Sequence, residues 1–481
     1  MIRMQEAATQ GADLSFLGLL FLVIMCVLTW TFQRRYAPIP LLITTCYMPL
    51  GQALVLAGLH FQFLRVLLLL GIVRVWVRGE GADLRLTYLD RLFITWGAAT
   101  LVMGTLNHPS FDRFINRSGE VFNAFGTYFL FRCWMRELKD VLSAVRLIAV
   151  LLVPLAISMA IEKVTRHNIF SVFGGVPEIT LVREGKLRCQ GAFRHPILAG
   201  TFAATSFPLC IALWFRGGRD RSLGLLGAVA SLVCTVAAAS SGALFALMGT
   251  GLGLGLWWFR TRMRLVRWGT VLGIVGLAFV MKAPVWYLFS RLSEVAGGTG
   301  WYRSYIIDQA ISHFNEWWLV GSANTASWAP AGEVTVGDPN NMDIINQFVA
   351  EGLGGGILKL GLFVAMIVQG FKVVGRCMSD GRLPRQDAIM VWAFGVSLFA
   401  HCLSFFSVSY FDQIIVIWYW LLAVMAALFS VAEIQSFADQ TSESAGAVPV
   451  EASPPADSSG GLGGQCFLVA GSAAGYWSRA T

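Results

Sequence analysis

Long apolar stretches separated by short polar connections dominate the chain. Each stretch has 17 or more mostly apolar residues, enough for a helix to cross the roughly 30 Å hydrocarbon core of a bilayer. The connection at His60 is so short that the two stretches beside it should form a tight hairpin. The pattern predicts an all-α polytopic membrane protein with about 13 transmembrane helices (12 to 14), at residues 14–32, 41–59, 61–77, 89–106, 119–135, 141–161, 195–215, 223–239, 243–259, 268–285, 348–371, 388–408 and 413–431.

Two long polar intervals interrupt this pattern. Residues 162–194 form the first, and residues 286–347 form the second and longer one. After the last apolar stretch, residues 435–481 are rich in Ser, Ala, Gly and Pro, a composition that predicts a disordered tail. We therefore expect one membrane domain at residues 1–434, with its chemistry in the two long loops, followed by a cytoplasmic tail.

Positive charge orients the predicted spans. Only 13% of the residues are charged, against about 25% in a soluble domain. Of the 36 Lys and Arg residues, 21 fall in the segments on one side of the membrane and 12 on the other, which assigns the richer side to the cytoplasm. Both long loops and the N-terminus then lie outside. The net charge of +8 reflects this bias and does not indicate nucleic-acid binding.

Several common functional motifs are missing from the sequence. It contains no HExxH, P-loop, GxGxxG or GxSxG pattern, which disfavours nucleotide-driven transport and hydrolase chemistry. The nine cysteines include no CxxC pair, and the first apolar stretch precedes Arg34 and Arg35, the reverse of the charge order of a cleavable signal peptide. We expect an uncleaved first helix, no metal and no cofactor.

Residues 301–318, WYRSYIIDQAISHFNEWW, predict an amphipathic helix in the second long loop. Arg303 falls in the middle of the apolar arc of this helix. A guanidinium at such a position must reach water or meet an anionic partner. Two interpretations follow: Arg303 snorkels to water, or it points into a cavity and binds a phosphate.

The end of the first long loop carries clustered basic residues. The segment LVREGKLRCQGAFRHPILAG places Arg183, Lys186, Arg188 and Arg194 within twelve positions. The planar fork of arginine suits a diphosphate, although a solvated loop beside lipid headgroups would show the same composition. His195 precedes Pro196, which is tolerated in a first helical turn, so His195 is a candidate ligand or only a helix-start residue.

Other polar residues lie within or beside the predicted spans. Arg65 lies about one turn below the outer surface, and we expect it to converge with the basic loop and Arg303 on one anionic site. Asp343 and Asn346 lie where the second loop re-enters the membrane. Asp343 is either a residue that orients or deprotonates a hydroxyl or the N-cap of the next span. The favoured role of Lys359 is a structural pair, for which Glu351 is a candidate partner.

Three segments together give the chain a likeness to a known family. RCQGAFRHPILAGT opens a span, GWYRSYIIDQAISHFNEWWLVG follows in the second loop, and DIINQFVAEGLGGG closes that loop. In these segments and in its polytopic pattern the chain resembles the O-antigen ligase / Wzy polymerase superfamily, and within it exopolysaccharide polymerase-like members.

The resemblance implies an architecture like that of GT-C glycosyltransferases and a metal-independent, inverting glycosyl transfer at the periplasmic face of a bacterial inner membrane. Donor and acceptor would be glycans on undecaprenyl diphosphate, and chain-length regulator and export proteins would be further partners. The diphosphate-holding arginines of the family match Arg188, in the R-x-x-G of this sequence, and Arg303. We expect Arg188, Arg303 and Asp343 to be catalytic and the substrate-binding residues to be Arg65, Arg183, Lys186, Arg194, His195, His313 and Asn346.

One departure from the family bears on the reaction. Ligases carry a histidine at the end of the large loop, where this chain has Asn340, Asn341, Met342 and Asp343. His313 is the remaining histidine of the loop. The difference favours a polymerase over a ligase that transfers glycan to a lipid A core or a protein. A small-anion transporter, a function assigned to some relatives, and a non-catalytic scaffold are the alternatives from other classes.

Overall fold

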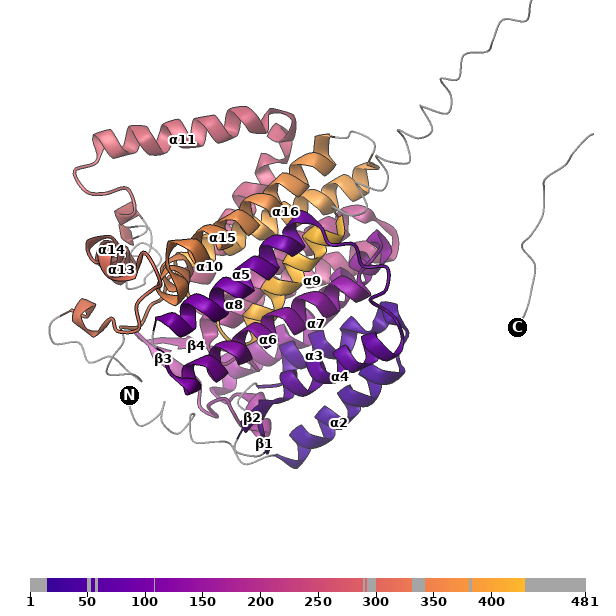
Figure 1. Cartoon of the computed structure of the whole chain (residues 1–481). Helices are drawn as coiled ribbons and strands as arrows, with labels where there is room; N and C mark the ends of the chain where they lie inside the picture. The colour runs from indigo at the N-terminus through magenta and orange to yellow at the C-terminus, as the bar shows by residue number, and fades with distance from the viewer. Residues whose placement is uncertain are drawn as a thin grey trace, which may run out of the picture. The chain divides into compact units, whose positions relative to one another are not determined.

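The computed structural model of the chain describes residues 15–49, 53–56, 59–107, 109–288, 290–291, 300–330, 342–379 and 383–428. Side chains are described for these residues except 53–61. By its internal contacts the chain divides into two units, Met1–Ile434 and Gln435–Thr481. The tail predicted at residues 435–481 lies outside the described residues. Most of the described chain is helical, and its helices form a bundle (Figure 1).

The helices follow one another with short connections for most of the chain. In order, they are α2 (Phe16–Thr31), α3 (Pro38–Tyr47), α4 (Phe63–Val77), α5 (Tyr88–Leu106), α6 (Phe111–Trp134), α7 (Leu138–Thr165), α8 (Pro196–Arg216), α9 (Gly218–Ala237), α10 (Ser241–Gly255), α11 (Met263–Val280), α13 (Gly300–Ser312), α14 (Phe314–Trp317), α15 (Gln347–Ser379), α16 (Arg385–Phe405) and a final helix, Gln413–Leu428. Two short antiparallel hairpins pair β1 (Ala53–Leu56) with β2 (Leu59–Gln62), and β3 (Leu181–Arg183) with β4 (Lys186–Arg188).

Six helical segments of the described chain are long and apolar enough to cross a membrane. This agrees with the predicted all-α membrane class. Twelve of the thirteen predicted spans coincide with helices, although several of these are shorter or more polar than a typical span. The six segments are Leu138–Thr165, Pro196–Arg216, Gly218–Ala237, Ser241–Val280, Gln347–Ser379 and Arg385–Phe405.

The predicted span at residues 41–59 is wrong as a continuous helix. α3 ends at Tyr47 after ten residues, and the β1–β2 hairpin follows it. Met48 adopts an extended conformation before Pro49. Proline disfavours the helical conformation of the residue before it, so the helix stops here although the sequence stays apolar.

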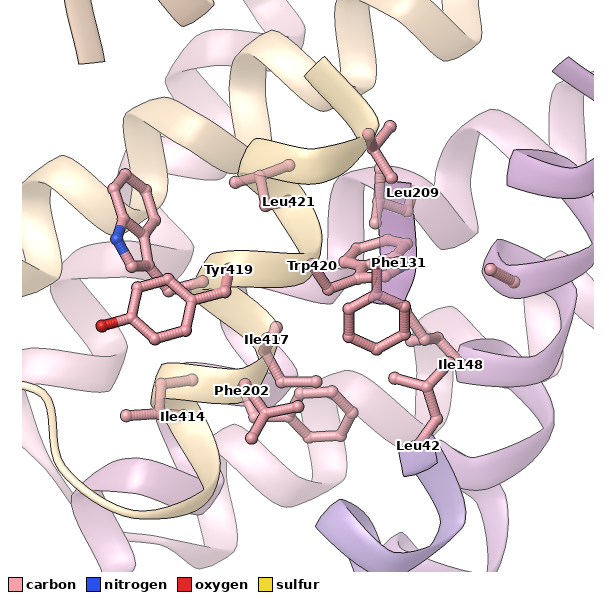
Figure 2. Packing of buried hydrophobic residues seen from close by; sticks show 14 of the residues in the cluster. Leu42, Phe131, Ile148, Phe202, Leu209, Ile414, Ile417, Tyr419, Trp420 and Leu421 are labelled. Carbon is pink, nitrogen blue, oxygen red and sulfur yellow. The ribbon is translucent and has the colours of Figure 1, made fainter. Parts of the chain in front are cut away.

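The final helix, Gln413–Leu428, lies in the core of the bundle. Nearly all of its side chains are buried, including Ile414, Ile417 and Trp420. Figure 2 shows these residues packed among side chains of α3, α6 and α8. The most sequence-distant parts of the bundle therefore share one hydrophobic core, which holds the ends of α7, α8 and α9 in fixed positions.

α15 is two helices joined at a break. Gly355 and Gly356 leave the helical conformation, and Gly356 has a positive φ of 70°. The end of α14 enters the break: the Ile357 amide donates to the Trp318 carbonyl (2.8 Å), and the Ser322 amide donates to the Leu353 carbonyl (3.1 Å). The break thus fastens the second long loop to the bundle.

The predicted continuous helix at residues 301–318 is also divided. α13 ends at Ser312, His313 leaves the helical path, and α14 begins at Phe314. The Trp317 indole donates back to the Ala310 carbonyl (2.7 Å), so the second segment folds against the first.

Candidate functional site

The β3–β4 hairpin places three basic residues on one face. Its two-residue turn, Glu184 and Gly185, has positive φ at both positions, the geometry of a type I′ turn. Arg183 pairs with Lys186, and Leu181 pairs with Arg188. Because side chains alternate between faces along a strand, Arg183, Lys186 and Arg188 lie on the same side of the hairpin.

A buried carboxylate binds the backbone of the loop that follows Arg188. Glu162, near the end of α7, accepts hydrogen bonds from the backbone amides of Gln190 (3.2 Å) and Gly191 (2.9 Å). Asn168 donates to the Gly191 carbonyl (2.8 Å). Gly191 has a φ of 57°, and a Cβ there would lie 2.9 Å from Leu155. The loop therefore has one well-defined path across the end of the bundle.

The Arg303 side chain and the backbone beside Arg188 both contact residues that flank the turn between α9 and α10. The Cys189 amide donates to the Ala237 carbonyl (3.1 Å), which brings its neighbour Arg188 to the start of this turn. The Arg303 Nη2 donates to the Ser241 hydroxyl (2.9 Å) at the start of α10. Arg303 is only 7% exposed and lies on the buried side of α13 with Ile306. This position contradicts snorkelling to water and agrees with a side chain that points into the bundle.

The electrostatics of these residues are coupled. Burial, together with the positive charge of Arg183, lowers the pKa of Arg188 and that of Arg303 to about 10. The positive charges of Arg183 and Arg188 also lower the pKa of His195. We call Arg183, Arg188, His195 and Arg303, with the Ser241 hydroxyl, the cationic centre. Crowded and partly desolvated guanidinium groups of this kind favour an anionic ligand.

His195 is an uncharged member of the cationic centre. It precedes α8, and its Nδ1 accepts a hydrogen bond from the Ile197 amide (3.2 Å), so His195 caps the start of this helix with one ring nitrogen. Burial, with the charges of Arg188 and Arg183, lowers the pKa of His195 to about 4. Because Nδ1 accepts, the neutral ring carries its proton on Nε2. His195 is therefore a neutral donor at physiological pH.

The structure assigns to Asn346 the helix-capping role that the sequence left open for Asp343. The Asn346 side chain accepts from the Val349 amide (3.2 Å) at the start of α15, so Asn346, and not Asp343, is the cap. The Asp343 carbonyl accepts from the Tyr302 hydroxyl (2.9 Å), next to Arg303 in the chain. Protein around Asp343 removes part of its hydration and raises its pKa, although one side of the residue is exposed.

The described contacts of three other predicted site residues are with residues outside this centre. Arg65 donates to Asn123 on α6 (3.2 Å). Arg194 pairs with Asp412 (3.3 Å), before the final helix. The His313 Nδ1 donates to the Gln309 carbonyl (3.0 Å), and the ring stacks on Trp328. Lys186, on the exposed tip of the β3–β4 hairpin, is nearer to the centre.

Two residues that organise the centre were not among the predicted site residues. Glu162 is a carboxylate at the end of a span just before a basic loop, and that position was a usable signal. Ser241 carried no such signal, because its contact with Arg303 joins residues 62 positions apart. The predicted pair of Lys359 with Glu351 is confirmed at 3.3 Å, and the Trp96 indole also donates to Glu351 (3.0 Å).

The arrangement can bind and stabilise a multiply charged oxyanion at the end of the bundle. Within the described ranges, no group of three or more His, Cys, Asp and Glu side chains is placed to hold a metal ion. No protein-family model and no curated protein matches the chain.

Proposed function

We propose that the protein is a membrane glycosyltransferase that polymerises lipid-linked oligosaccharide repeat units at the outer face of a bacterial inner membrane. The donor is a glycan on undecaprenyl diphosphate. The observation that carries this proposal is that two separate loops bring Arg303, and Arg188 through its neighbour Cys189, to residues that flank the α9–α10 turn, with the charge of Arg183 acting on both arginines. Two guanidinium groups, with the positive charge of Arg183 acting on both, suit the several oxygens of a diphosphate better than a single carboxylate.

In the proposed reaction, an acceptor hydroxyl attacks the anomeric carbon from the side opposite the diphosphate. The new C–O bond forms while the bond from the anomeric carbon to the phosphate oxygen breaks, and the electron pair leaves with the diphosphate. Arg188 and Arg303 stabilise the charge that develops on that oxygen, and His195 donates a hydrogen bond from Nε2. Asp343 accepts the hydroxyl proton, and its raised pKa makes it the stronger base.

The same proposal assigns the membrane arrangement. About 13 helices cross the membrane, the N-terminus and the two long loops are periplasmic, and the C-terminus is cytoplasmic. The 21 to 12 division of basic residues supports this orientation. The acceptor is a second lipid-linked glycan, and chain-length regulator and export proteins are the expected partners.

One observation favours a second candidate, transport of a small anion. α15 is a broken helix with the buried Lys359 and Glu351 beside its break, and broken helices often form transport sites. However, Lys359 is already paired with a carboxylate, whereas the cationic centre lies at the end of the bundle. A ligase that transfers glycan to a lipid A core or a protein would use the same centre.

The test is deletion of the gene followed by complementation with single variants. Loss of a polymerase leaves single repeat units on the lipid, loss of a ligase leaves long chains on the lipid, and loss of a transporter leaves both pools unchanged. We expect Arg188→Ala and Arg303→Ala each to lower polymer formation by about 10²-fold, the effect of removing one oxyanion-stabilising donor.

Arg166→Asn is the matched control for these variants. Arg166 is an exposed basic residue of the same loop with a φ of 63°, a conformation that asparagine tolerates. Protein levels in the membrane are measured by immunoblot. Normal polymer in cells that carry both Arg188→Ala and Arg303→Ala would overturn the proposal.

A further inference from the structure

The connection between α16 and the final helix is largely buried. α16 ends at Phe405, and the final helix begins at Gln413. We call residues 407–413 the linking segment. Connections usually run over the protein surface, where water satisfies their backbone polar groups. Four residues of the linking segment are at most 9% exposed, namely Ser407, Val408, Tyr410 and Gln413. Their partners lie in three other parts of the chain.

Gln413 joins the linking segment to the end of the first long loop. Its Nε2 donates to the Ala192 carbonyl (2.9 Å), and its Oε1 accepts from the Arg194 amide (3.4 Å). Asp412 adds an ion pair with the Arg194 guanidinium (3.3 Å). These bonds fix the backbone directly before His195, a member of the cationic centre.

Tyr410 joins the linking segment to the end of the second long loop. The Tyr410 amide donates to Oε1 of Gln347, the first residue of α15 (2.5 Å). The Gln347 Nε2 donates in turn to the buried Glu351 one helical turn later (2.7 Å). Asp343 precedes Gln347 by only four residues. The segment that carries Asp343 into α15 therefore has its far end fixed at the linking segment.

Ser407 packs against the start of α10. A Cβ at Gly242 would lie 2.8 Å from the Cβ of Ser407, so the missing side chain of Gly242 permits this close approach. Ser241, the residue before Gly242, accepts the hydrogen bond from Arg303. The linking segment thus contacts the residue next to the one that binds Arg303.

The linking segment is itself fixed by the hydrophobic core. Ile414, which follows Gln413, is fully buried and packs with Ile417 among side chains of the bundle (Figure 2). The Tyr410 hydroxyl forms a hydrogen bond with Nδ1 of His401 on α16 (2.6 Å). Side chains in a close-packed core change position little. The linking segment can therefore hold the ends of both long loops in fixed positions.

We propose that Gln413 and Gln347 are positioning residues, which hold the two long loops at one fixed separation through the linking segment. These roles rest on the proposed function, because they require that the arginines of both loops bind one diphosphate together. Neither glutamine has to touch the ligand. A displacement of about 1 Å in a group that binds the reacting atoms can lower a rate about 10²-fold.

The experiment measures binding of inorganic diphosphate to the purified full chain by titration calorimetry, well below the melting temperature of each variant. Gln413→Leu removes both hydrogen bonds of a buried side chain. Gln347→Leu is the milder second variant, because Gln347 is only half-buried. Gln369→Leu is the matched control. Gln369 is 5% exposed but lies thirteen residues after Gly356 at the break in α15, about 20 Å along the helix.

We expect Gln413→Leu and Gln347→Leu each to weaken diphosphate binding about tenfold, the lower end of the effect of removing a residue that orients a metal ligand. Polymer formation should fall about 10²-fold. Gln369→Leu should leave diphosphate binding unchanged even where its melting temperature falls. Because both glutamines act through one segment, the double variant should bind about as weakly as the weaker single variant.

The unchanged protein separates these roles from the proposed function. If it does not bind diphosphate, the proposed function fails and the positioning roles fail with it. If it binds diphosphate and Gln413→Leu binds equally tightly, only the positioning roles fail, whatever the melting temperatures are. If Gln413→Leu does not accumulate in the membrane, Gln347→Leu decides by the same criterion. Effects that multiply in the double variant would overturn the shared linking segment.

Discussion

Arg303 and His195 show how one neighbourhood shifts the pKa of two basic side chains in the same direction but leaves them with different charges. Burial and positive neighbours lower the pKa of both, to about 10 for Arg303 and to about 4 for His195. Arg303 stays charged at neutral pH because even the lowered value lies well above 7. His195 loses its charge for the same physical reason. The centre thus combines fixed positive charge with a neutral hydrogen-bond donor.

The lowered pKa of His195 predicts a loss of stability in acid. Between about pH 6.5 and pH 4 the unfolded chain binds a proton at His195 and the folded chain does not, so stability falls as the pH falls through this window. The full effect is about 3 kcal/mol. We expect His195→Asn, which keeps a capping side chain without a titrating group, to show a shallower decline in melting temperature from pH 7 to pH 4.5.

The comparison uses tryptophan fluorescence of both proteins in the same detergent. Asp343 and Asp412 have raised pKa values and change stability in the opposite direction, so the difference between the two proteins isolates His195. Parallel declines in the two proteins would contradict the prediction.

For single residues, the sequence predicted which residues belong to the cationic centre better than it predicted the contacts that they make. Arg303 was visible because helical periodicity is local: a charged residue on an apolar arc stands out within one helix. Its partner Ser241 was not visible, because only the packing of α10 against the loop brings them together. The contact of Arg65 with Asn123 on α6 was not visible for the same reason. Hydropathy gives the depth of a residue in a span but not the direction in which its helix faces.

The break in α15 is the element that joins the second loop to the membrane bundle. It replaces helical hydrogen bonds at Leu353 and Ile357 with bonds to the end of α14. In the GLGGG run, the structure uses Gly356 for a positive φ and for close approach of another backbone. A run of glycines cannot show by itself which of these functions it has.

Gly356→Ala should therefore be strongly destabilising. A Cβ at this position would lie 2.3 Å from the Leu319 carbonyl oxygen, and the positive φ adds a further penalty. We expect a loss of more than about 2 kcal/mol, seen as a lower melting temperature and reduced polymer formation.

Gly361→Ala is the control in the same helix. Nothing lies within 4 Å of a Cβ at Gly361, so alanine should be neutral or should stabilise α15 by about 0.5–1 kcal/mol. Similar melting temperatures for the two variants would show that the break tolerates a side chain.

Elements were predicted well where apolar periodicity and length agree, and poorly where a local backbone signal opposes them. α7, α8 and α16 lie within a few residues of their predicted spans. α3 is the failure, because an apolar composition continues through Met48 and Pro49 while the backbone turns away. Composition alone cannot distinguish an apolar helix from an apolar hairpin.

For the whole molecule, the charge bias predicts which end of the bundle faces outward. Lys186→Cys lies on the hairpin beside the cationic centre, and Arg219→Cys lies at the start of α9, on the opposite side in the proposed orientation. In intact cells, a membrane-impermeant maleimide should label Lys186→Cys and not Arg219→Cys. After lysis it should label both.

The natural cysteines set the background of this assay. The eight in the described chain are buried or half-buried, so these eight should react weakly. Cys466 lies outside the described residues and is replaced by serine in all the proteins compared. Labelling of Arg219→Cys, but not of Lys186→Cys, in intact cells would reverse the orientation and place the cationic centre in the cytoplasm.

The crowding of Arg183, Arg188 and Arg303 has a practical consequence for ligand discovery. Like charges that lie close together lower the stability of the folded protein. A polyanion that binds between them should therefore raise the melting temperature above that of the protein without ligand. A ligand at a hundred times its dissociation constant adds about 2.7 kcal/mol. Heat resistance can therefore rank phosphates, diphosphates and lipid diphosphates before any sugar, acceptor or linkage is known.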